Sequence, residues 1–115
     1  MDRKALRRAY KESPPPMGVY AVRNTVENKV LLGASPNVAG RLNRERFSLE
    51  NGSHFNRTLV ADWNRLGPDA FVFEVLDTLE PSEDPDADSA EDLDALLLMW
   101  IDRLGLHPED IYAHR

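Results

Sequence analysis

The sequence contains no cysteine among its 115 residues, which excludes disulfide bonds and thiolate metal sites. Long apolar runs are also missing. The run from Leu96 to Ile101 falls far short of the roughly 20 apolar residues that a membrane-spanning helix needs. The basic N-terminus lacks the apolar segment that marks a signal peptide. These absences predict a cytoplasmic protein without a membrane partner.

Charges of the two signs are unevenly distributed along the chain. The net charge is −6, but the first 46 residues contain ten basic and four acidic side chains, whereas the rest contains four basic and sixteen acidic ones. A nucleic-acid backbone would be attracted to the first part and repelled by the second. The total charge therefore neither supports nor excludes DNA or another nucleic acid as a partner, and a protein partner stays open.

Two short apolar runs, residues 17–22 and 29–33, flank a polar segment and predict a β-hairpin. The hairpin would be followed by a helix over about residues 36–49. Ser35 is the candidate N-cap of this helix, and Pro36 would lie in its first turn. Because Arg41 falls on this helix, the Tyr20 phenol and the Arg41 guanidinium would converge at one end of a small sheet.

The second half of the chain predicts two helices and a strand. Ser53 is the candidate N-cap of a helix over about residues 54–66. Alternating residues predict a third strand over 71–76, and a broad apolar face predicts a helix over about 90–104. The residues of that apolar face are Leu93, Leu96, Leu97, Trp100, Ile101 and Leu104. The short tail after it is expected to pack Ile111 or Tyr112 onto the domain.

The predicted elements indicate one small domain with an extension. Residues 1–16 would form a helical extension and a proline-rich approach to the first strand. Residues 17–115 would form a single domain, because no internal repeat or boundary interrupts them. Three strands with helices around them predict a small α/β fold of the α+β sandwich type, a three-stranded sheet flanked by helices.

Several short motifs occur in a fixed order along this domain. Gly18-Val19-Tyr20 is followed by Leu31-Leu32-Gly33 and by Arg41. The matching positions further along are His54, Phe55, Asn56, Leu59, Asp62, Trp63 and Gly67. This ordered set resembles the GIY-YIG nuclease family. The resemblance implies a small mixed sheet of three strands, and cleavage of DNA phosphodiester bonds with one divalent metal ion.

The resemblance also implies roles for individual residues. Tyr20 would activate a water as the base, and Arg41 would bind the scissile phosphate. Arg44, His54 and Asn56 are the candidate substrate-binding residues. Considered without the family, Tyr20 would be a packing residue at a sheet end and His54 a cap or surface residue.

Three positions depart from the family pattern. Leu31 replaces the second motif tyrosine and cannot take part in proton transfer. Glu45, one helical turn after Arg41, replaces a histidine or tyrosine with an acid that would repel an anionic substrate. Leu97, three residues before Trp100, stands where the family has its metal-binding glutamate.

These departures leave three hypotheses for function. The first is a degenerate domain, catalytically weakened or inactive, that binds DNA or another partner. The second is an active endonuclease with a rearranged site, in which Glu45 and His54 would bind Mg²⁺ or Mn²⁺. The third is a protein-interaction domain without nucleic-acid binding. The first hypothesis predicts no metal and no other cofactor, because Leu97 cannot bind an ion.

Overall fold

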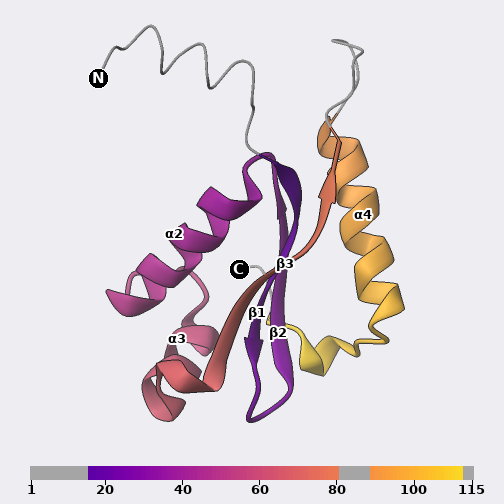
Figure 1. Ribbon diagram of the computed structural model, residues 1–115. Coiled ribbons are helices and arrows are strands. Elements are labelled where there is room, and N and C mark those ends of the chain that lie inside the picture. Colours follow the sequence, from indigo (N-terminus) through magenta and orange to yellow (C-terminus); the bar gives the residue numbers. More distant parts are fainter. Residues whose placement is uncertain (1–15, 81–88, 113–115) are drawn as a thin grey trace, which may run out of the picture.

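The computed structural model describes residues 16–80 and 89–112. Strands β1 (Met17–Asn24), β2 (Lys29–Ser35) and β3 (Phe71–Leu79) form one sheet in the order β2-β1-β3 (Figure 1). Strand β1 pairs antiparallel with both neighbours. The α+β class predicted from the sequence is confirmed. The expectation of a mixed sheet is wrong, because both strand pairings are antiparallel. The chain returns to the turn end of the hairpin before β3 begins, where Phe71 pairs with Asn24.

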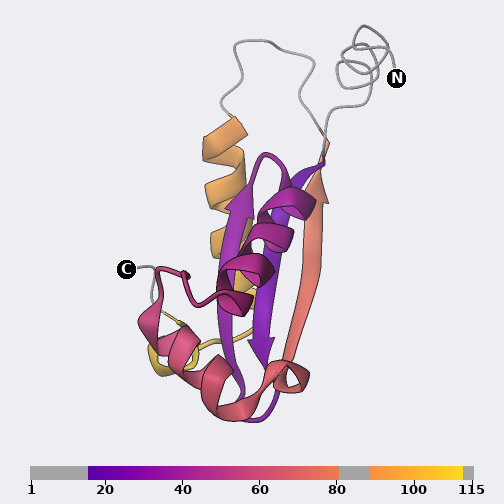
Figure 2. The ribbon, with the colours of Figure 1, turned by 90° about the vertical axis from the view of Figure 1, so that its left-hand side faces the viewer.

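Three helices cover the two faces of this sheet. Helices α2 (Val38–Glu50) and α3 (Arg57–Leu66) lie on one face, and α4 (Ser89–Arg103) lies on the other (Figure 1). Figure 2 views the molecule from the side that α2 and α3 cover. Short 3-10 turns, η1 (Pro68–Ala70) and η2 (Pro108–Asp110), precede β3 and the C-terminal residues. No helix within residues 16–80 and 89–112 is long and apolar enough to cross a membrane.

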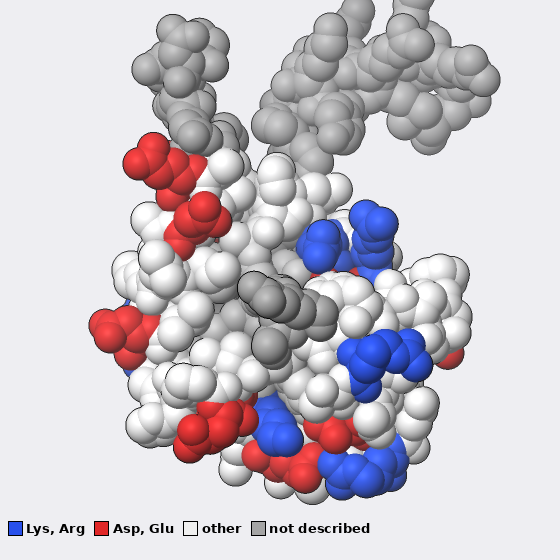
Figure 3. Space-filling view, turned by 180° about the vertical axis from the view of Figure 1, so that it is seen from behind, with Lys and Arg blue, Asp and Glu red and all other residues white. Residues whose placement is uncertain are grey.

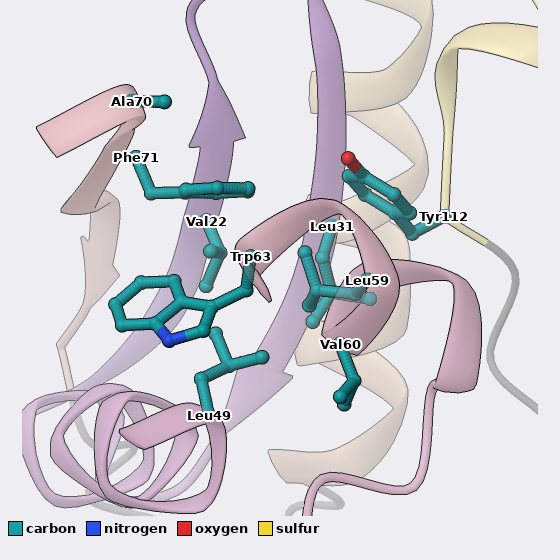
Figure 4. Packing of buried hydrophobic residues seen from close by; sticks show 9 residues of the cluster. All are labelled: Val22, Leu31, Leu49, Leu59, Val60, Trp63, Ala70, Phe71 and Tyr112. Carbon is teal, nitrogen blue, oxygen red and sulfur yellow. The ribbon is translucent and has the colours of Figure 1, made fainter. Parts of the chain in front are cut away.

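Each face of the sheet has its own apolar cluster. The α2 and α3 face holds the larger one (Figure 4), made of Val22, Leu31, Leu49, Leu59, Val60, Trp63, Ala70, Phe71 and Tyr112. The α4 face holds Ala21, Val30 and Leu32, against which Leu76, Leu97, Ile101 and Leu106 pack. Strand alternation produces this division, since neighbours along a strand point to opposite faces. Burial of each large side chain contributes about 1.5–3 kcal/mol.

Both helices of the first face begin later than the sequence predicted. Helix α2 starts after Asn37, whose side chain accepts a hydrogen bond from the Gly40 N–H at 3.0 Å. Ser35 is therefore not the N-cap, and Pro36 lies outside the helix. Helix α3 starts after Asn56 rather than after Ser53. Asparagine amides cap both helices, because a side-chain oxygen satisfies an otherwise unpaired N–H of the first turn.

Strand β3 and helix α4 agree more closely with the prediction. Phe71 and Phe73 join the cluster under α2 and α3, whereas Leu76 joins the one under α4. The two faces predicted for this strand are thus confirmed, although the strand runs on to Leu79. Leu104 was predicted on the inward face of the last helix, but it lies beyond the helix end and is exposed.

The C-terminal residues return to the sheet, as predicted. Ile111 forms a parallel bridge with Val30, and Tyr112 is buried in the larger apolar cluster. The predicted helix over residues 2–12 and the prolines 14 and 15 lie outside the described residues, so the proposed N-terminal extension stays a prediction.

Candidate functional site

Tyr20 is held in the middle of the sheet by its partner on β2. It pairs with Gly33 and is 1% exposed. A Cβ atom at Gly33 would lie 2.4 Å from the Tyr20 hydroxyl oxygen. The ring therefore passes directly over the glycine, and any larger residue at position 33 would displace it. This contact explains why the tyrosine of the first motif and the glycine of the second occur together.

Three side chains, those of Tyr20, Arg41 and His54, meet around the carboxylate of Glu45. The Tyr20 hydroxyl and the Arg41 Nε each donate a hydrogen bond to Glu45 Oε1, both at 3.0 Å. His54 Nε2 contacts the other oxygen, Oε2. Glu45 itself is 3% exposed. We call this group, Tyr20, Arg41, Glu45 and His54, the Glu45 centre.

The segment before α3 fixes the imidazole of this centre. The Asn56 N–H donates to His54 Nδ1 at 3.0 Å, so this nitrogen is an acceptor. In the neutral ring the proton then sits on Nε2 and is donated to Glu45. The Asn56 side chain caps α3 by accepting from the Leu59 N–H, and Asn56 is buried. Asn56 thus orients His54 through its backbone N–H and caps α3 through its side chain, and its role in substrate binding stays a prediction.

Burial and hydrogen bonds move the pKa values of Tyr20 and Glu45 in opposite directions. Burial, together with the negative charge of Glu45, raises the pKa of Tyr20 to about 12. Burial alone would raise the pKa of Glu45, but the hydrogen bonds from His54, Tyr20 and Arg41 outweigh it and hold this pKa below its ordinary value. At neutral pH the phenol is therefore a protonated donor and the carboxylate is its anionic acceptor.

An open pocket of about 270 Å³ lies directly outside the Glu45 centre. Its lining residues are Arg41, Arg44, Glu45, Ser48, Ser53, His54 and Phe55. Arg44 is exposed and makes no ion pair with any residue that the structure describes. The structure therefore brings Tyr20, Arg41 and His54 together at the centre and places Arg44 at the pocket outside it.

Phe55 and the two serines of this pocket were not among the predicted site residues. Phe55, Leu59 and Trp63 are spaced four residues apart, which predicts one shared face of the helix expected over about residues 54–66, but Phe55 precedes α3 and is 45% exposed. That assignment was wrong because the helix starts three residues later than expected. Asn56 as a competing N-cap was the signal that could have revealed it.

Leu31 and Leu97 lie away from the Glu45 centre. Leu31 is fully buried in the larger cluster, where it pairs across the sheet with Val22. Leu97, on α4, packs against the smaller cluster on the opposite face of the sheet. Neither position supplies a polar atom to the centre.

The residues around Glu45 do not fit a divalent cation in this arrangement. Three donors already occupy the two carboxylate oxygens, and His54 presents an N–H on one side and an engaged acceptor on the other. Metal ligands must offer unprotonated lone pairs. Within residues 16–80 and 89–112, no group of three or more histidine, aspartate or glutamate side chains is placed to hold a metal ion.

Comparison with solved structures identifies the fold. The chain superposes on the catalytic domain of the homing endonuclease I-TevI with a TM-score of 0.64 and 23% identity, covering 86% of this chain and 98% of that domain. A mutant of the I-TevI catalytic domain gives a TM-score of 0.66 and 23% identity, covering 87% and 94%. No family model and no curated protein matches the sequence. The protein has a GIY-YIG endonuclease-like fold.

Proposed function

We propose that this domain binds nucleic acid, DNA in the first place, and does not cleave it. The observation that carries the proposal is the Glu45 centre. One buried carboxylate engages the tyrosine, the arginine and the histidine that would otherwise serve a scissile phosphate. A protonated phenol that donates to Glu45 is not prepared to take a proton from water. The centre therefore supports a structural role in a domain with lost catalysis.

The distribution of charge supports binding on the face formed by α2 and α3. Residues 38–66 contain five basic side chains and three acidic ones, and two of these acids, Glu45 and Asp62, are buried in internal ion pairs. Helix α4 has four acidic side chains and one basic one. In Figure 3 basic side chains gather mostly on the side of α2 and α3, and acidic ones mostly on the side of α4. Phosphates are attracted to the first face and repelled by the second.

Two alternatives make different demands on the structure. An active endonuclease dependent on Mg²⁺ or Mn²⁺ requires Glu45 and His54 to exchange their present hydrogen bonds for a metal. A protein-interaction domain would use α4, where Leu98 and Met99 are exposed beside acidic residues. The described residues favour the non-cleaving nucleic-acid domain, for which we propose a cytoplasmic location.

Replacement of Arg44 tests the binding surface. We expect Arg44→Ala to weaken binding to a short DNA duplex in low salt, and to reduce the slope of log K against log salt by about 0.7–0.9, because one phosphate contact is lost. Arg103→Ala is the matched control, since Arg103 lies on α4 and contacts the Trp100 ring. Fluorescence anisotropy over a salt series measures both. Absence of wild-type binding at the lowest salt would instead favour the protein-interaction domain.

A further inference from the structure

Two exposed phenylalanines flank the pocket side of α2. Phe47 is 66% exposed and Phe55 is 45% exposed. The other large hydrophobic residues exposed in the described part of the chain are aliphatic: Val26, Val72, Val75, Leu98, Met99 and Leu104. Exposure of an aromatic ring has a cost in water, so two of them beside one basic pocket indicate a ligand with flat apolar faces.

Each of the two phenylalanines has its own relation to Arg44. Phe55 lines the pocket together with Arg44 and the serines Ser48 and Ser53. Phe47 follows Arg44 by three residues on α2, so the two side chains are neighbours on the helix surface. The arrangement therefore places Phe55 in the pocket with a cation and two hydroxyl groups, and Phe47 beside the same cation on the surface of α2.

The Phe55 ring also has a rigid support. It stacks on the His54 ring with centroids 4.6 Å apart and an interplanar angle of 22°. His54 is in turn fixed by Glu45 and by the Asn56 N–H. One face of Phe55 is thus backed by the fold. A base stacking on the outer part of the ring would meet a preorganised surface, which lowers the entropy cost of binding.

We propose that Phe47, Phe55 and Arg44 form a platform for unpaired nucleotides, on which bases stack while Arg44 and the pocket hold the phosphate. The platform rests on the proposed nucleic-acid function and assigns its ligand class, a single-stranded segment. Proteins usually bind single strands with aromatic side chains combined with basic groups, because every unpaired base has a free π face. In a duplex those faces are covered by neighbouring base pairs, so only the phosphate contacts remain.

The test compares a labelled single strand of about 12 nucleotides, within the usual site size, with the duplex of the same sequence in a metal-free buffer. Single strands are used as DNA and as RNA. We expect tighter binding of the single strand than of the duplex. Phe47→Leu and Phe55→Leu should each weaken single-strand binding by about 5- to 140-fold, the equivalent of about 1–3 kcal/mol per stacked base. Duplex affinity should fall by a much smaller factor than single-strand affinity.

Two controls separate stacking from other effects. Leu98→Ala removes an aliphatic side chain that is 66% exposed on α4, as exposed as Phe47, and should leave both affinities unchanged. Phe55→Trp retains a stacking ring and should keep single-strand binding. Thermal unfolding of each variant shows whether the support at His54 is intact.

The outcomes distinguish the platform from the proposed function. Duplex binding as tight as single-strand binding, or leucine variants that bind the single strand like the wild type, would overturn the platform and leave nucleic-acid binding in place. Failure to bind either form at low salt would overturn both. A preference for either the DNA or the RNA single strand would support the platform. It would also show whether the platform binds deoxyribose or ribose strands more tightly.

Discussion

Glu45→Ala is expected to lower the free energy of unfolding by about 3–5 kcal/mol, the range for removal of one partner from a buried charged network. Glu45 is 3% exposed and accepts from Tyr20, Arg41 and His54. Its loss leaves the Tyr20 hydroxyl and the His54 N–H buried without partners, each of which costs free energy. Urea unfolding followed by circular dichroism measures the change.

Two comparisons make this result specific to the carboxylate. Glu50→Ala removes an exposed acid from the last residue of the same helix and should change stability by less than about 0.5 kcal/mol. The folded pKa of Glu45 lies below its ordinary value of 4.5, so its stabilisation is complete above that pH and is lost as pH falls through the folded pKa. The difference between wild type and Glu45→Gln should therefore shrink in acid. A stability difference that does not change with pH, or a Glu45→Ala variant as stable as Glu50→Ala, would contradict the stabilising role assigned to the Glu45 carboxylate.

Tyr112→Ala is expected to cost about 3–5 kcal/mol, as for other buried aromatic residues. Tyr112 comes from the far end of the chain and is 3% exposed. Its hydroxyl donates to Asp62 Oδ2 at 2.7 Å and accepts from Asn24 Nδ2 at 3.0 Å. The residue thus joins β1, α3 and the C-terminal segment, and its loss removes both apolar packing and two buried hydrogen bonds.

Tyr112→Phe isolates the hydroxyl group from the ring. We expect a smaller cost of about 1–3 kcal/mol, because Asp62 and Asn24 each lose a buried partner while the packing stays. Glu109→Ala changes an exposed side chain of the nearby turn η2, should leave Tyr112 in place and serves as the control. A phenylalanine variant as unstable as the alanine variant, or an alanine variant as stable as wild type, would contradict the packing described for this residue.

Local patterns were enough to predict the three strands and the alternation of β3, but not the pairing of β3 with β1. Alternation along residues 71–76 placed Phe73 and Leu76 on opposite sides, as they are found. The helix starts were predicted less well because several residues competed as caps. Ser35 and Asn37 both lie before α2, and only the three-dimensional path of the chain decides which side chain reaches the free N–H.

The Glu45 centre shows where sequence reasoning reached its limit. The motif spacing indicated that Tyr20 and Arg41 approach one another, and both are found on the same carboxylate oxygen. Arg41 and Glu45 are four residues apart on a helix, a spacing that indicates an ion pair. The partners Tyr20 and His54 come from outside that helix, 25 and 9 residues away in sequence. Their convergence depends on tertiary packing, which no local pattern encodes.

A plasmid-nicking assay tests the central claim, binding without cleavage, most directly. Supercoiled DNA is incubated with the protein at a concentration and salt at which a gel shift confirms binding, with Mg²⁺ or with Mn²⁺. We expect the recovered plasmid to remain supercoiled with either ion, because the tyrosine, arginine and histidine of the centre are engaged by Glu45. Nicking that disappears in Tyr20→Phe and Arg41→Ala would contradict the account and establish an active endonuclease.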